Sequence, residues 1–182
     1  LYTGFLLWSA YQPKDPMTWW MEVTPALMGA CALCITWRRF HLTSLAYTLV
    51  LLHCIILMVG GHYTYAEVPM FDTLRDLVNG SRNQFDKLGH FAQGFVPALL
   101  AREILIRKNI IQGAGWRAFL IVCFCLAFSA FYELVEWWAA LIIGGEADAF
   151  LGTQGYVWDT QSDMAMALFG AIAALLLLGR LH

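Results

Sequence analysis

The stretch WRAFLIVCFCLAFSAFYELVEWWAALII (Trp116–Ile143) determines the class of this protein. It is about 28 residues long, and about 20 apolar residues are enough for a helix to cross a bilayer. A backbone in lipid must satisfy its own hydrogen bonds, which favours a helix here. Two acids, Glu133 and Glu136, interrupt the apolar run. The stretch therefore predicts a long membrane helix that carries a pair of carboxylates.

Further apolar runs lie on both sides of this stretch. The first run is only about half as long as a span, and we interpret it as the end of a longer helix. The runs are Leu1–Tyr11, Trp19–Arg39, Thr43–Gly61, Asp86–Arg107 and Thr160–Gly179. Short alternating segments, which a membrane β-barrel would need, are not visible. We expect an all-α, polytopic membrane helix bundle with about six transmembrane helices, the first truncated, in a single domain over residues 1–182.

The composition excludes other classes of protein. Hydrophobic residues make up 60% of the chain and charged residues 13%, against roughly 45–50% and about 25% in soluble domains. Disorder does not fit such an apolar chain. The formal net charge is −2 and no basic stripe is present, which argues against nucleic-acid binding. The expected partner is the lipid bilayer.

The connection between residues 62 and 85 contains one amphipathic segment. PMFDTLRDLV (Pro69–Val78) would place five apolar residues on one helical face and three charged residues on another. The apolar set is Met70, Phe71, Leu74, Leu77 and Val78, and the charged set is Asp72, Arg75 and Asp76. This pattern predicts a short helix that lies in the membrane interface.

The distribution of Lys and Arg predicts the orientation, because cytoplasmic loops carry an excess of both. Seven of these residues fall on one side: Arg38, Arg39, Arg102, Arg107, Lys108, Arg117 and Arg180. Four fall on the other: Lys14, Arg75, Arg82 and Lys87. The Gly144–Thr160 connection on this second side is acidic, with Glu146, Asp148 and Asp159. We expect both termini to be cytoplasmic and the acidic side to face outward.

Three predicted helices carry paired ionisable residues near the outer side. Asp86 and His90 are spaced i,i+4, Glu133 and Glu136 i,i+3, and Asp159 and Asp163 i,i+4, so each pair shares a helix face. Glu133 and Glu136 would lie roughly 10–15 Å below the outer end of their helix. The aspartates also fit a second interpretation, as helix caps or first-turn acids. The two glutamates lie in the middle of a helix and do not fit it.

Such a set of side chains suits a divalent cation, because clustered carboxylates at an apolar depth need a counter-charge or protons. Oxygen-rich ligation with one or two imidazoles favours Mg, Mn or Fe over Zn. The predicted ligands are Asp86, His90, Glu133, Glu136, Asp159 and Asp163. Within that set Glu133, Glu136 and His90 are the candidate catalytic groups, as base, acid or ligand. His62, Tyr132 and Gln93 are candidates for a supporting shell.

Three segments together resemble a known family. They are FDKLGHFAQGFVPALLAREI (Phe85–Ile104), SAFYELVEWWAA (Ser129–Ala140) and DAFLGTQGYVWDTQSDM (Asp148–Met164). They are similar to the YjdF family of bacterial inner-membrane proteins, a domain of unknown function. The resemblance implies a polytopic protein of the bacterial inner membrane. It implies no activity, although the six predicted ligands all fall on its motifs.

Three functions are compatible with these residues. The first is a metal-dependent hydrolase or transferase that acts on a lipid or lipid-linked substrate from the outer leaflet. The second is a proton- or cation-coupled transporter that uses the buried carboxylates. Few polar groups continue toward the inner side, which counts against transport. The third is a non-catalytic binding or assembly protein with a structural metal.

Overall fold

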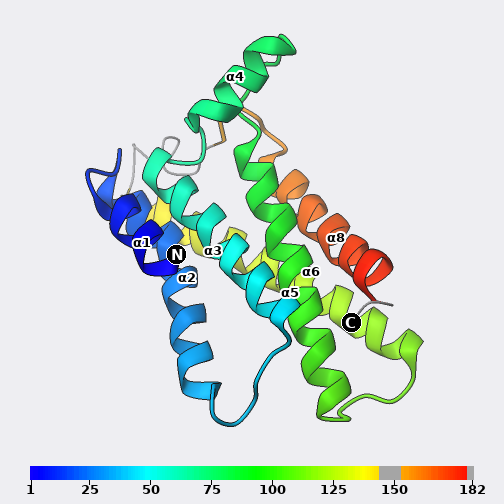
Figure 1. Cartoon of the computed structure of the whole chain (residues 1–182). Coiled ribbons are helices and arrows are strands. Elements are labelled where there is room, and N and C mark those ends of the chain that lie inside the picture. The colour runs from blue at the N-terminus through cyan, green and yellow to red at the C-terminus, as the bar shows by residue number, and fades with distance from the viewer. Residues whose placement is uncertain (144–152, 180–182) are drawn as a thin grey trace.

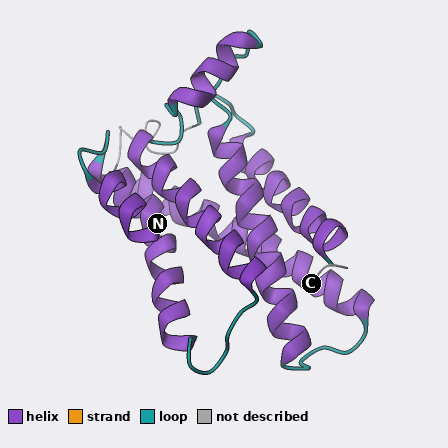
Figure 2. Ribbon diagram, viewed as in Figure 1, coloured by secondary structure: helices purple, strands orange, loops and turns teal. Residues whose placement is uncertain are grey.

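The computed structural model describes residues 1–143 and 153–179. Within these ranges the chain forms seven α-helices and no strand (Figures 1 and 2). They are α1 (Tyr2–Ala10), α2 (Pro16–Thr36), α3 (Ser44–Tyr63), α4 (Pro69–Leu77), α5 (Phe85–Arg107), α6 (Ala114–Ile143) and α8 (Asp159–Leu178). The all-helical prediction is therefore confirmed. Glu146, Asp148 and Arg180, which entered the orientation argument, lie outside the described residues.

Four helices are long and apolar enough to cross a membrane. They are α2, α3, α6 and α8, and the qualifying part of α6 covers 29 residues. The expectation of six spans is not supported. At nine residues, α1 is too short, and α5 has the length, with 23 residues, but carries several charged side chains. The finding is a helical membrane protein with four candidate spans in the described part of the chain.

In the described residues the long helices form an antiparallel bundle with two apolar centres along its length and a third buried apolar cluster where the loop after α3 meets the start of α5. One centre lies between α2 and α3, where Trp19, Val23 and Met58 are buried and α1 packs alongside. The other joins α5, α6 and α8 through buried small and branched side chains, Ala98, Ile121, Cys125, Ala171 and Ala174. The ends of α3 and the starts of α5 and α8 lie at the same end of the bundle, beside α4 (Figure 1). We call this the α4 end.

Helix starts on both sides of the bundle are capped by side chains. At the start of α2, Asp15 accepts hydrogen bonds from the Thr18 amide at 2.7 Å and from its hydroxyl at 2.5 Å. These bonds hold the pKa of Asp15 below its usual value. At the opposite end, Glu103 accepts from both the amide and the hydroxyl of Thr43, and Arg107 pairs with it at 2.6 Å. This contact fixes α3 against α5 at the end far from α4.

The predicted amphipathic segment is a helix, α4, with its apolar residues Met70, Leu74 and Leu77 exposed. Arg75 pairs with Asp72 and Asp76, each at 2.8 Å. α4 projects from the rest of the bundle (Figure 1). An exposed apolar face next to ion-paired residues is typical of a helix at a membrane interface. Its location in the interface stays a prediction.

Two glycines set the distance between α5 and α8. A Cβ on Gly94 would collide with the backbone carbonyl of Ala167, and one on Gly170 would collide with the carbonyl of Phe91. Small residues allow such close backbone contact between membrane helices. No other pair of helices in the described residues packs as extensively as α5 and α8. The contact therefore determines how the polar residues at their N-terminal ends meet.

We expect Gly94→Ala to force α5 and α8 apart and to destabilise the protein by about 1–3 kcal/mol. The matched control is Gly29→Ala in α2, because a Cβ there meets no atom within 4 Å. That change should be neutral or stabilise by about 0.5–1 kcal/mol through helix propensity. Thermal unfolding of the detergent-purified variants measures both effects. Equal midpoints for the two variants would show that the close contact is not required.

Candidate functional site

His90 lies at the centre of a buried polar cluster. Its Nε2 is 3.4 Å from Oδ1 of Asp86, one turn earlier on α5, and 3.8 Å from Oδ1 of Asp163 on α8. Its Nδ1 is 3.8 Å from Oε1 of Glu133 on α6. Carboxylates from three helices thus face one imidazole. His90, Glu133 and Asp163 are all less than a tenth exposed.

Gln93 gives this imidazole a defined orientation. Its side-chain oxygen lies 3.0 Å from Nδ1 of His90. An amide oxygen can only accept, so this contact assigns a ring proton to Nδ1 and turns Nε2 away from Gln93. That nitrogen is the one that faces Asp86 and Asp163. An outer partner that fixes the tautomer in this way is common for metal-binding histidines.

Three of the six predicted ligands lie close enough together to share a cation. One ligand atom from each of Asp86, His90 and Asp163 lies within 4.8 Å of the other two. Two oxygens and one nitrogen make a ligand set for a divalent metal. Glu133 lies beside the group, against His90, whereas Asp159 is engaged elsewhere. The helix spacing explains the geometry, because i,i+4 residues on α5 face the start of α8.

The start of α5 is held in place by Asn83. Its side-chain oxygen accepts from the Phe85 amide at 3.0 Å, and its side-chain nitrogen donates to the Val68 carbonyl at 3.0 Å. Gln154 bonds the backbone of Asn83 on both its amide and its carbonyl. The fully buried Asn83 therefore links the loop after α3, the start of α5 and the segment before α8.

Two cations that the sequence reasoning did not place in the site neutralise its acids. The Nζ of Lys87 lies 2.6 Å from Asp163 and 2.7 Å from Asp159. Arg82 reaches Asp159 at 2.5 Å and Asp86 at 3.4 Å. The counter-charge that clustered carboxylates need thus comes from the start of α5 and the residues just before it. The signal was available, since Lys87 adjoins Asp86 and Arg82 precedes it by one turn.

A second polar region adjoins His90 on the side of α2 and α6. A cavity of about 50 Å³ lies there, with Asp86, His90 and Gln93 on its wall. Five further polar side chains line it: Glu22, His53, Tyr65, Tyr132 and Glu136. A liquid water occupies about 30 Å³, so the cavity has room for a water molecule. The predicted Glu136 thus borders this cavity and not the three-residue group.

Glu22 is the other site residue that sequence reasoning missed. It is buried on α2, and its Oε2 accepts a hydrogen bond from the hydroxyl of Tyr132 at 3.0 Å. A single acid in an otherwise apolar run was the available signal. Tyr65, in the loop after α3, also lines the cavity. Burial raises the pKa of its phenol well above the usual value. Its hydroxyl therefore stays protonated.

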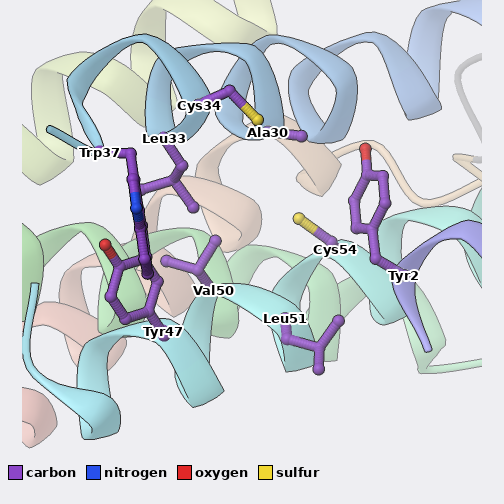
Figure 3. A pocket seen from close by; sticks show the side chains of 9 residues that line it. All are labelled: Tyr2, Ala30, Leu33, Cys34, Trp37, Tyr47, Val50, Leu51 and Cys54. Atoms are coloured by element: carbon purple, nitrogen blue, oxygen red, sulfur yellow. The ribbon is translucent and has the colours of Figure 1, made fainter. Parts of the chain in front are cut away.

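His62 is not brought into the cluster. Its Nδ1 lies 3.1 Å from the carbonyl of Ser9, and its ring packs on Trp8 between α1 and α3. The much larger pocket nearby, about 580 Å³ between α1, α2 and α3, is lined by apolar and aromatic side chains with Cys34 and Cys54 (Figure 3). None of the described residues that line it carries a carboxylate or an imidazole. The charged cluster, not this pocket, is the candidate functional site.

Similarity to known proteins confirms that this chain is a membrane protein. A bundle of long apolar helices with an ionic cluster between them defines an integral membrane protein. The chain belongs to a family described as predicted membrane protein (DUF2238), whose model matches residues 1–182. The chain is 54% identical over 180 residues to inner membrane protein YjdF of Escherichia coli (strain K12). The aligned region covers 99% of this chain and 86% of that protein. No solved structure matches the chain.

Removal of Lys87 should leave the carboxylates of Asp159 and Asp163 buried without their shared cation. We expect Lys87→Met to destabilise the protein by about 3–5 kcal/mol, because an unpaired buried charge is costly. Arg75→Gln is the matched control, since its ion pairs on α4 are more exposed and exposed ion pairs contribute little to stability.

Unfolding midpoints in detergent compare the two variants. Adding Asp163→Asn to Lys87→Met should restore part of the lost stability. If Lys87→Met were as harmless as Arg75→Gln, the buried ionic network would not stabilise the bundle.

Proposed function

We propose that this protein is a divalent-metal-dependent hydrolase or transferase that acts on a lipid or lipid-linked substrate. The single observation that carries the proposal is the group formed by Asp86, His90 and Asp163, whose ligand atoms lie within 4.8 Å of one another. Buried ionisable residues among membrane helices are costly and usually serve a function. We expect Mg, Mn or Fe rather than Zn, because two of the three ligand atoms are carboxylate oxygens.

The chain's own residues divide into distinct roles. Asp86, Asp163 and Nε2 of His90 would bind the cation, which acidifies a bound water and polarises a substrate oxygen. Gln93 holds the His90 ring in the required tautomer. Glu133 suits the role of general base, because its Oε1 is buried and has no hydrogen-bond partner in the described part of the chain. Glu136 and Tyr132 would hold water in the adjoining cavity.

Transport is less well supported by the arrangement of polar groups. A pathway for protons or cations would need polar groups along the whole length of the bundle. Beyond Gln93 the contact of α5 with α6 and α8 is apolar, with Ala98, Cys125 and Ala174 fully buried. The polar cluster around His90 thus ends in an apolar zone, which favours a site reached from the α4 end.

We also propose how the chain sits in the bacterial inner membrane. In this arrangement α5 crosses as a fifth span beside the four apolar helices, packed against α3, α6 and α8. The excess of Lys and Arg at the opposite end supports an orientation in which the α4 end faces outward. The metal group would then lie close to the outer leaflet, and both termini inside.

Elemental analysis of the detergent-purified protein tests the metal site. We expect the wild type to retain a divalent metal and the double variant His90→Gln, Asp163→Asn to lose it, because two of the three ligands are gone. His62→Gln is the control, since this histidine contacts Ser9 and Trp8 instead. Metal content that is unchanged in the double variant would remove the basis of the proposal.

Glu133→Gln separates an enzyme from a protein with a structural metal. This change keeps the shape of the side chain and removes the base, so we expect metal content to persist while turnover of a lipid substrate falls by about 100-fold or more. Turnover equal to wild type would exclude Glu133 as the base.

Labelling of single cysteines in intact cells tests the orientation. In a background without the native cysteines, Ser81→Cys at the α4 end should react with a membrane-impermeant maleimide, and Gln112→Cys should not. Both positions are exposed in the structure, so only the side of the membrane distinguishes them. The reverse pattern would place the site on the cytoplasmic side.

A further inference from the structure

Two cations are buried beside the metal group. The side chains of Arg82 and Lys87 are 8% and 13% exposed. Buried Lys and Arg are rare and are normally paired. Here both share Asp86 and Asp159, and Lys87 also contacts Asp163. They lie at the same end of the bundle as the predicted ligands and are not themselves ligands.

The charge balance of these side chains depends on the metal. Without a metal, three aspartates face the two cations. With a divalent cation on Asp86, His90 and Asp163, the three aspartates, the two cations and the metal would sum to +1 on the Nε2 side of His90, whereas the Glu133 carboxylate lies at Nδ1. Lys87 would then share Asp163 with the metal. An anion is then the complementary ligand. The starts of α5 and α8 meet here, and the positive ends of their dipoles add to the same field.

One atom of this group lacks a partner. Nε of Arg82 is buried and makes no hydrogen bond in the described residues, although both terminal nitrogens of the guanidinium do. A planar guanidinium with an unused donor fits the oxygens of a phosphate group. The ring of Tyr156 lies over both cations, at 5.5 Å from Arg82 and 5.9 Å from Lys87. Tyr156 is 42% exposed and so separates the cations from the surface.

The surroundings of Tyr156 suggest where such a ligand resides. Val157 and Trp158 follow it and are 84% and 61% exposed, directly before the buried Asp159. Exposed Tyr and Trp residues favour the boundary between membrane and water. The exposed apolar face of α4 lies at the same end. A phosphate on a lipid headgroup would be at this depth.

We propose that Arg82 and Lys87 form a phosphate-binding subsite next to the metal group, so that the substrate is a compound with a phosphate group, carried on a lipid. This rests on the proposed metal-dependent function and adds the chemical class of its substrate. Arg82 and Lys87 bind the phosphate oxygens, Asp159 holds the two cations together, and Tyr156 covers them when the subsite is empty.

The test uses the full chain in dodecyl maltoside, which has no phosphate group. Mn²⁺ is titrated first and followed by electron paramagnetic resonance. Short-chain phosphatidic acid is then added to the Mn²⁺-loaded protein, with diacylglycerol as the same lipid without phosphate and inorganic phosphate as the free anion. We expect phosphatidic acid to bind and diacylglycerol not to bind. Tighter binding of phosphatidic acid than of inorganic phosphate supports the lipid source, and equal binding assigns the subsite to free phosphate.

Variants then locate the binding. Arg82→Gln should weaken phosphatidic acid binding by about tenfold or more, because a charged hydrogen bond is lost, and Arg82→Lys should weaken it less. Mn²⁺ affinity should persist in Arg82→Lys, which keeps the positive charge, and this shows that the protein is folded. Arg75→Gln on α4 is the control and should bind like the wild type.

The outcomes separate this inference from the proposed function. Mn²⁺ binding with equal phosphatidic acid affinity in wild type, Arg82→Lys and Arg82→Gln would overturn the phosphate subsite and leave the metal site standing. A wild type that binds no Mn²⁺ would overturn both. If Arg75→Gln weakened phosphatidic acid binding as much as Arg82→Gln, the lipid would be attracted by the general positive charge at this end of the bundle. That result would also overturn the subsite.

Discussion

The close contact between α5 and α8 is the constraint on which the site depends. Gly94 and Gly170 allow each helix to rest on the backbone of the other, and no side chain separates them. At this distance the first turns of both helices share one space, so Asp86 and His90 on α5 reach Asp163 on α8. A wider separation would leave these buried groups without partners, which is why packing and site geometry are linked in this bundle.

The ionic cluster is compatible with a membrane helix bundle because its charges are matched locally. Arg82 and Lys87 form ion pairs with Asp86, Asp159 and Asp163. Each ring nitrogen of His90 lies next to a carboxylate. Below it the helices return to small apolar side chains. The molecule thus combines a polar cluster at the α4 end with an apolar middle of the bundle. That division favours chemistry on a substrate that approaches from one leaflet.

Local patterns predict the helices and part of the site, and tertiary contacts determine the rest. Apolar runs give α2, α3, α6 and α8 because lipid forces each segment to satisfy its own backbone. Helical spacing places Asp86 with His90, since i,i+4 residues share a face. Neither pattern reveals that Glu22 on α2 meets Tyr132 on α6. His62 lies at the expected end of its helix, but its ring contacts the Ser9 carbonyl and not the cluster. The direction in which a side chain points from a helix depends on which helices pack against it, and the sequence pattern does not reveal this.

The most direct measurement is pulsed electron paramagnetic resonance of the Mn²⁺-loaded protein. The account predicts nitrogen coupling from one imidazole bound to the metal, present in the wild type and in His62→Gln and absent in His90→Gln. Coupling that persists in His90→Gln, or Mn²⁺ that shows no nitrogen ligand at all in the wild type, would contradict a metal held between α5 and α8.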